Sequence, residues 1–188
     1  MTTPQRTLLV ADIFGKTPAL EELAQALDGD IDIIDPYQGK YMAFSSEAEA
    51  YQYFSQNVTV GGYQQILEGV IEKVTSPTRV VAFSVGGSAF WSLSDSLSNR
   101  NISCGVCFYS SQIRYAVSVN PKLPIQLYFP LQEEHFSVDD LILALAGKDL
   151  VSIEQTQYLH GFMNKYSMQF NQQAYQEFIG QLNQIECE

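Results

Sequence analysis

Short strand-like segments alternate along the chain with segments of helical spacing, and this alternation limits the fold more than any other feature. Six predicted strands cover residues 7–14, 31–37, 79–83, 102–110, 124–129 and 152–159. Predicted helices cover residues 18–28, 46–57, 62–75, 88–98, 137–147 and 172–185. Strands separated by helices indicate an α/β fold, with a mostly parallel sheet covered by helices on both faces.

The composition suits one compact domain spanning residues 1–188. Hydrophobic residues make up 46% of the chain, enough for a sizeable core, and no repeat or Pro/Gly-rich linker marks a boundary. The formal net charge is −11 and no Lys/Arg cluster reverses it locally, so neither nucleic acid nor a membrane is expected as a partner. No apolar run approaches the ~18 residues that span a bilayer, and no secretory leader is recognisable, so we expect a cytoplasmic location. Nothing in the sequence indicates an oligomeric state.

The three cysteines are Cys104, Cys107 and Cys187, an odd number that argues against a disulfide framework. Cys104 and Cys107 form a C-x-x-C motif, which elsewhere indicates redox chemistry or zinc. Here the motif lies inside a predicted strand, where residues three apart face opposite sides of the sheet. No second pair of metal ligands accompanies it. We therefore expect no metal site, and predict that Cys104 and Cys107 are buried structural thiols.

Polar and glycine-rich segments follow several of the predicted strands. They are "DIFGK" (12–16), "SVGGS" (84–88), "PLQEEHFS" (130–137) and "HGFMN" (160–164). In open parallel sheets, ligands bind beyond the carboxyl ends of the strands. These four segments are therefore the place to look for chemistry.

Ser84 lies between a predicted strand and a predicted helix, in "AFSVG". A nucleophile elbow needs small residues two before and two after the nucleophile, because the sharp turn brings neighbouring backbone close. Ala82 and Gly86 meet this need, although glycine is usual at the first position. The amide of Val85 would then stand at a helix N-terminus, which favours an anion. A phosphate-cradling or purely structural loop is the alternative interpretation of this segment.

A serine nucleophile needs a base and a carboxylate that orients the base. The chain has two histidines, His135 and His160, both near the ends of predicted strands. Gly161 allows a tight loop that brings the His160 imidazole over Ser84. Glu133 and Glu134 follow the fifth strand, so the order along the chain is serine, glutamate, histidine, as in α/β-hydrolases.

These motifs together resemble the dienelactone hydrolase family of the α/β-hydrolase superfamily, over nearly the whole chain. "LLVADIFGKTPALEELAQAL" resembles the opening strand, loop and first helix of that family. "VVAFSVGGSAFW" is similar to its G-x-C/S-x-G-G elbow, and "PIQLYFPLQEEHFSV" to the strand that ends in its acid loop. "HGFMN" resembles its histidine loop.

The resemblance implies a hydrolase that needs no cofactor and cleaves a small ester, lactone or thioester through an acyl-enzyme. Ser84 takes the nucleophile position, His160 the base and Glu134 the acid, with Glu133 as the alternative one register away. The amides of Ile13 and Val85 would form the oxyanion hole, and Asp12 takes the place of a glutamate beside the nucleophile. A neutral His160 is needed as base, so activity is expected to fall below about pH 6.

Three departures from the family pattern bear on activity and substrate. Asn164 replaces an arginine that grips the substrate carboxylate in dienelactone-cleaving members, and Arg114 is a further candidate to line the site. Ala82 and Glu134 both differ from the usual residues. They leave open a catalytically weak or inactive hydrolase-fold protein that binds a small ligand or partner in the same crevice. A flavodoxin-like nucleotide binder that uses "SVGGS" is a third possibility, which leaves "HGFMN" without a role.

Overall fold

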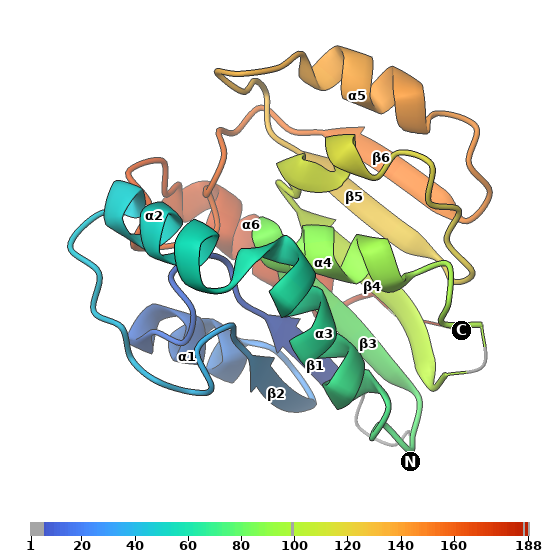
Figure 1. Cartoon of the computed structure of the whole chain (residues 1–188), viewed down its shortest axis with the longest axis horizontal. Helices are drawn as coiled ribbons and strands as arrows, with labels where there is room; N and C mark the ends of the chain where they lie inside the picture. The colour runs from blue at the N-terminus through green and yellow to red at the C-terminus, as the bar shows by residue number, and fades with distance from the viewer. Residues whose placement is uncertain (1–5, 99, 186, 188) are drawn as a thin grey trace.

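A computed structural model describes residues 6–98, 100–185 and 187. All strand pairs in it are parallel, in one six-stranded sheet of order β2-β1-β3-β4-β5-β6 (Figure 1). The strands are β1 (Arg6–Val10), β2 (Asp30–Ile34), β3 (Thr78–Phe83), β4 (Ile102–Phe108), β5 (Ile125–Phe129) and β6 (Val151–Gln155). The helices are α1 (Pro18–Ala26), α2 (Glu47–Asn57), α3 (Thr59–Ile71), α4 (Val85–Leu93), α5 (Val138–Leu145), α6 (Gln172–Leu182) and the short 3₁₀ helix η1 (Ser111–Tyr115). The predicted parallel α/β architecture is confirmed.

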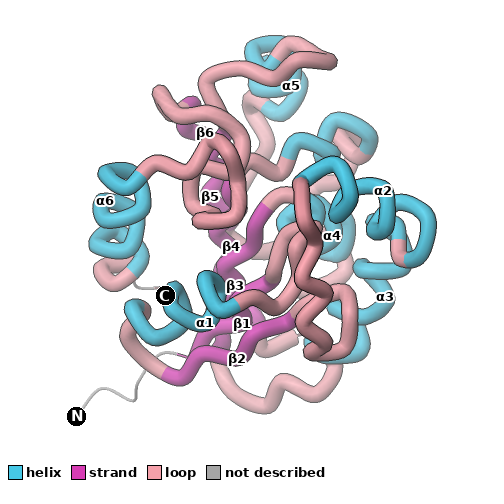
Figure 2. The backbone as a smooth tube through the Cα atoms, turned by 90° about the vertical axis from the view of Figure 1, so that its left-hand side faces the viewer, coloured by secondary structure: helices cyan, strands magenta, loops and turns pink. Residues whose placement is uncertain are grey.

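The helices form two layers around the sheet. In Figure 2, α1 and α6 lie on one side of the strands, with α3 and α4 on the other. Side chains of β3 alternate between the two cores, because successive residues of a strand face opposite sides. Val80 and Ala82 pack with α3 and α4, whereas Val81 and Phe83 pack with α1 and α6. Every residue of β3 is buried, as expected for a central strand of a doubly covered sheet.

Hydrogen bonds from Arg79 and a disulfide join the sheet to helix α6 and the segment that follows it. The buried Arg79 guanidinium donates hydrogen bonds to the carbonyl oxygens of Leu182 and Ile185. Leu182 is the last residue of α6, and a cation is favoured at the C-terminus of a helix. Cys104 is joined to Cys187 by a disulfide. The prediction of two free thiols is therefore wrong for Cys104 and right for Cys107, which is free and buried. Spacing near Cys104 could not show that a residue 83 positions away reaches it.

The order of the strands reverses between β1 and β3, which are neighbours although β2 lies between them in the chain. At such a switch point the connections after the two strands leave toward opposite faces, and a crevice opens between them. The loop after β1 and the turn after β3 meet there, so "DIFGK" and "SVGGS" share this part of the sheet edge. No helix within the described residues is both long and apolar enough to cross a membrane.

Candidate active site

Ser84 is the single residue between β3 and α4, and its backbone is strained. Its φ is +50° and its ψ is −116°, outside the regions that non-glycine residues favour. Its amide donates to the Phe108 carbonyl oxygen at 2.9 Å, which continues the pairing of β3 with β4. Its own carbonyl oxygen accepts from the Ser88 amide at 3.0 Å, which starts α4. The chain turns from strand to helix within one residue, and this projects the Ser84 side chain from the sheet edge.

Close packing around this turn requires the two glycines that follow. A Cβ atom on Gly86 would lie 2.4 Å from the Ala11 carbonyl oxygen. A Cβ on Gly87 would overlap the Ser110 side chain. Ala82, at the position where glycine is usual, is fully buried between the neighbouring strands, and the sharp turn forms with its methyl group present.

His160 follows β6 in a loop that is held against the protein core by a buried phenylalanine. Gly161 has a φ of +87°, and a Cβ there would lie 2.4 Å from Ser167 Oγ, so glycine is required. Phe162 is fully buried and packs on the rings of Phe108 and Phe178. This anchoring explains the "HGF" sequence: glycine permits the turn, phenylalanine holds the loop down, and the imidazole is presented to the sheet edge.

Ser84, His160 and Glu133 form one hydrogen-bonded chain. Ser84 Oγ lies 3.0 Å from His160 Nε2, and His160 Nδ1 lies 2.7 Å from Glu133 Oε1. An ionised carboxylate can only accept, so Nδ1 carries the proton and Nε2 faces the serine with its lone pair. Glu134 is exposed, and no hydrogen bond within the described part of the chain joins it to His160. Between the two carboxylates named from the sequence, the geometry therefore favours Glu133 over Glu134.

The surroundings of Glu133 keep its carboxylate ionised. Burial alone would raise its pKa, but the hydrogen bond and charge of His160, the hydroxyl of Ser111 and the charge of Arg114 outweigh burial. The pKa of Glu133 therefore lies below its usual range. A carboxylate that stays ionised near neutral pH can stabilise an imidazolium beside it.

The amides of Ile13 and Val85 lie in the two segments that meet at the switch point. Val85 is the first residue of α4 and is buried, and Ile13 follows β1 in a loop. The Ile13 loop is held in place by Tyr37, whose hydroxyl donates to the Ile13 carbonyl oxygen at 2.6 Å. Within the described residues, neither amide nitrogen has a hydrogen-bond acceptor. Both are thus available to an anionic oxygen.

Asp12 links the loop after β1 to the histidine loop. Its carboxylate accepts from the Phe14 amide at 2.9 Å and from Asn164 Nδ2 at 2.6 Å. Burial raises the pKa of Asp12, against the lowering effects of these two hydrogen bonds and of His160 nearby. From the sequence, Asn164 stood out only because it replaces an arginine of the family pattern. In the structure, its side chain donates a hydrogen bond to Asp12.

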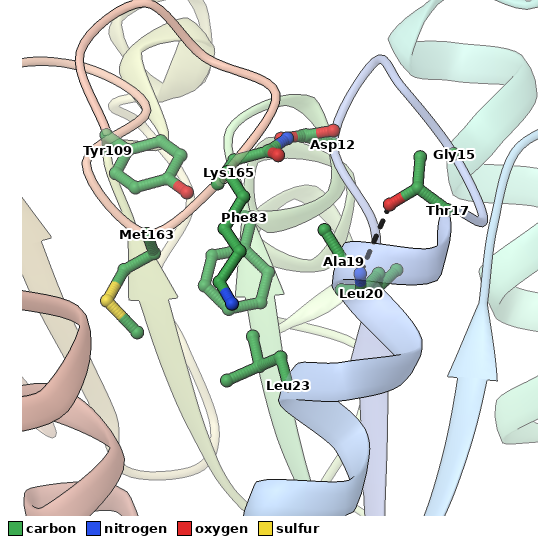
Figure 3. A pocket seen from close by; sticks show the side chains of 11 residues that line it. Asp12, Gly15, Thr17, Ala19, Leu20, Leu23, Phe83, Tyr109, Met163 and Lys165 are labelled. Atoms are coloured by element: carbon green, nitrogen blue, oxygen red, sulfur yellow. Dashed lines mark hydrogen bonds between the residues drawn. The ribbon is translucent and has the colours of Figure 1, made fainter. Parts of the chain in front are cut away.

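A small cavity lies beside Asp12, between α1 and the histidine loop (Figure 3). Its volume is about 20 Å³, room for one water molecule. The buried Tyr109 hydroxyl lines it and has no hydrogen-bond partner among the residues that the structure describes. Ser84 does not line this cavity, which is too small for an acyl group.

Arg114 lies on η1, close to the glutamate of the hydrogen-bonded chain. Its guanidinium packs against the rings of Tyr115 and Phe136, 4.2 and 4.6 Å from their centres. It also donates to the Ser111 carbonyl oxygen at 2.8 Å. Its positive charge is one of the causes that lower the pKa of the Glu133 carboxyl.

The remaining groups considered from the sequence are His135 and the possible metal ligands. His135 is exposed and contributes nothing to the chain Ser84–His160–Glu133. In residues 6–98, 100–185 and 187, no three His, Cys, Asp or Glu side chains are grouped so that they could hold a metal ion. Ser111, whose hydroxyl donates to Glu133, is a residue of this site that the sequence did not predict. Its position directly after the predicted strand 102–110 is a signal for it, because the predicted site segments also follow strands.

In sequence, the chain is similar to a protein of Bacillus subtilis. No family model matches the chain. The uncharacterized protein YczH of Bacillus subtilis is 29% identical over 171 residues, which cover 87% of this chain and 83% of the relative. The similarity extends over most of both chains.

Solved structures with the same arrangement are more numerous, at low sequence identity. Mouse alpha/beta hydrolase domain-containing protein 10 superposes with a TM-score of 0.64 at 12% identity, over 97% of this chain and 89% of its own. A cold-adapted esterase from an Arctic intertidal metagenomic library gives 0.61 at 16%, over 97% and 83%. A dienelactone hydrolase-like promiscuous phosphotriesterase from metagenomic libraries gives 0.58 at 10%, over 98% and 88%. The chain therefore has the α/β-hydrolase fold.

Proposed function

We propose that the protein is a serine hydrolase of the dienelactone hydrolase type that cleaves a small carboxylic ester, lactone or thioester. The observation that carries this proposal is the hydrogen-bonded chain from Ser84 Oγ through the His160 ring to Glu133. Nucleophile, base and orienting carboxylate come from three separate loops of one sheet edge. A purely structural serine would not need a strained backbone aimed at an imidazole nitrogen.

In the first half of the reaction, Ser84 Oγ bonds to the substrate carbonyl carbon while its proton passes to His160 Nε2. The carbonyl oxygen becomes an oxyanion that accepts from the amides of Ile13 and Val85. When the tetrahedral intermediate collapses, the bond to the leaving oxygen or sulfur breaks. The leaving group takes the proton from Nε2, and the acyl-enzyme remains.

In the second half, water replaces the leaving group. Its oxygen bonds to the acyl carbon while one of its protons passes to His160 Nε2. Collapse of this second intermediate breaks the Ser84 Oγ–carbon bond and returns the proton to the serine, which releases the carboxylic acid. Throughout both halves, Glu133 holds the Nδ1 proton and stabilises the imidazolium.

The experiment is steady-state hydrolysis of p-nitrophenyl acetate by the wild-type protein, Ser84→Ala and His160→Ala. We expect each substitution to lower kcat by at least about 10³-fold, because triad members act as a unit. Ser92→Ala is the matched control, since it removes another hydroxyl of α4, one that donates to the Ser88 carbonyl oxygen. A folded wild-type protein without hydrolysis, or a fully active Ser84→Ala variant, would overturn the proposal.

A further inference from the structure

Ser111 is a buried serine at the start of η1, three residues after the end of β4. Its side-chain oxygen lies within hydrogen-bonding distance of Glu133 Oε1 and 3.3 Å from His160 Nδ1. Its other acceptor is the Tyr109 carbonyl oxygen, also at 3.3 Å. A hydroxyl has one proton to donate, and the charged carboxylate is the nearer and stronger acceptor. Glu133 Oε1 thus accepts two donors, the His160 ring and the Ser111 hydroxyl.

The two ends of this contact differ in how firmly they are held. Glu133 lies in the connection 130–137, which has no helix or strand of its own. Ser111 is tied down by its backbone: its amide donates to the Tyr109 carbonyl oxygen at 2.9 Å, and its carbonyl oxygen accepts from Arg114. Within the described residues, the hydrogen bonds to the Glu133 carboxylate come from Ser111 and His160. Ser111 is therefore the contact that fixes Glu133 independently of the histidine.

We infer that Ser111 is a positioning residue, which clamps the Glu133 carboxylate and so holds the His160 ring in the orientation and tautomer that the reaction needs. This inference rests on the proposed function. A glutamate side chain has one more rotatable bond than an aspartate side chain, and ordering it costs more conformational entropy. A rigid donor at the start of η1 offsets that cost.

The clamp has a consequence for the pH profile. Without the Ser111 hydroxyl, the Glu133 carboxylate is no longer fixed against the His160 ring, so it stabilises the imidazolium less. The charged groups around His160 and Glu133 are Arg114 on η1, Asp12 after β1 and, farther out, Glu47 on α2. The titratable Tyr109 also packs on His160, with 5.0 Å between the ring centres. None of them changes in a Ser111 variant. The acid limb of kcat/KM, which reports protonation of the free base, should then move to lower pH.

The test is the dependence of kcat/KM on pH for p-nitrophenyl acetate hydrolysis by Ser111→Ala. We expect kcat/KM to fall about 10- to 100-fold, the usual effect of losing a hydrogen bond to a charged group. We also expect the acid limb to move downward by at least about half a pH unit. Ser111→Thr, which keeps the hydroxyl, should restore the limb. Ser110→Ala is the matched control, because that neighbouring buried hydroxyl donates to the Phe108 carbonyl oxygen instead.

The outcomes separate this inference from the proposed function. An active wild-type protein with an unchanged rate in Ser111→Ala, or a Ser111→Ala variant whose acid limb stays in place or moves up, would overturn the positioning role. A wild-type protein without Ser84-dependent hydrolysis would remove the proposed function, and the inference with it. If Ser111→Ala does not fold, Ser111→Cys keeps the size with only a weak donor and should show the same displaced limb.

Discussion

His160 Nδ1 lies 2.7 Å from Glu133 Oε1, although the two residues are 27 positions apart and belong to separate loops. The loops are joined by a backbone hydrogen bond from the Leu131 amide to the Tyr158 carbonyl oxygen, at 2.7 Å. Each loop also follows one of two paired strands, β5 and β6. The sheet thus brings the acid and the base together, and the side chains complete the contact.

The first prediction distinguishes the two adjacent glutamates. Glu133→Gln should lower kcat by about 10²- to 10⁴-fold, because an amide in place of the acid allows the wrong tautomer of His160. Glu134→Gln is the matched control and should leave kcat within about twofold, since that side chain is exposed. The measurement is ester hydrolysis by both purified variants. A larger loss of kcat in Glu134→Gln than in Glu133→Gln would show that Glu134 is the acid, and would contradict the assignment of Glu133.

The second prediction concerns the pH dependence of stability. The pKa of Glu133 is lower in the folded protein than in the unfolded chain, so the folded state favours the ionised form. The corresponding stability is present above the unfolded value of about 4.3 and is lost as the pH falls through the folded value. The difference in unfolding free energy between the wild-type protein and Glu133→Gln, measured in urea, should therefore shrink from pH 7 toward pH 3. A difference that grows on acidification would contradict the lowered pKa.

The third prediction uses two glycines in different surroundings. A Cβ on Gly86 would press on the Ala11 carbonyl oxygen, so Gly86→Ala should lower the unfolding free energy by about 1–3 kcal/mol. Gly69 lies in α3 with no atom within 4 Å of such a Cβ, so Gly69→Ala should raise it by about 0.5–1 kcal/mol. Urea denaturation measures both. Equal effects of the two substitutions would mean that the turn after Ser84 is not closely packed.

The fourth prediction concerns the link between β4 and the C-terminal segment. Reducing the Cys104–Cys187 disulfide, which closes a separation of 83 residues, should lower the unfolding free energy by about 2–4 kcal/mol. Thermal unfolding with and without dithiothreitol measures the change. Cys187→Ser should unfold at the lower temperature in both conditions. Cys107→Ser should keep the response to reductant, because Cys107 is the buried free thiol.

Most of the architecture could be predicted because its signals are local and periodic. The continuous apolar run of β3 indicates a strand that is buried on both faces. The spacing of the apolar residues in α3 indicates which face of that helix is buried. The boundaries shifted where a tertiary contact decides them. The first strand ends at Val10 rather than residue 14, because the Asp12 carboxylate accepts from the Phe14 amide and turns the chain there. Helix α4 begins at once after Ser84 because glycines 86 and 87 allow the tight approach.

The site could be predicted as a set of loops, and less well as a set of contacts. Ser84 and His160 are each followed within two residues by a glycine whose backbone role is visible in the sequence. Glu133 and Glu134 are adjacent in a loop without periodicity, so no pattern decides which of them faces the histidine. The pairing of Asp12 with Asn164 joins residues 152 positions apart, and nothing near either one records it.

The most direct test of the central proposal is covalent labelling by a fluorophosphonate, which reacts with an activated serine. The wild-type protein should gain the mass of one adduct, and peptide mapping should place that adduct on Ser84. Ser84→Ala should gain none, and His160→Ala should react far more slowly, because its serine lacks a base. A folded wild-type protein that stays unlabelled, or an adduct that persists in Ser84→Ala, would contradict the assignment of Ser84 as the nucleophile.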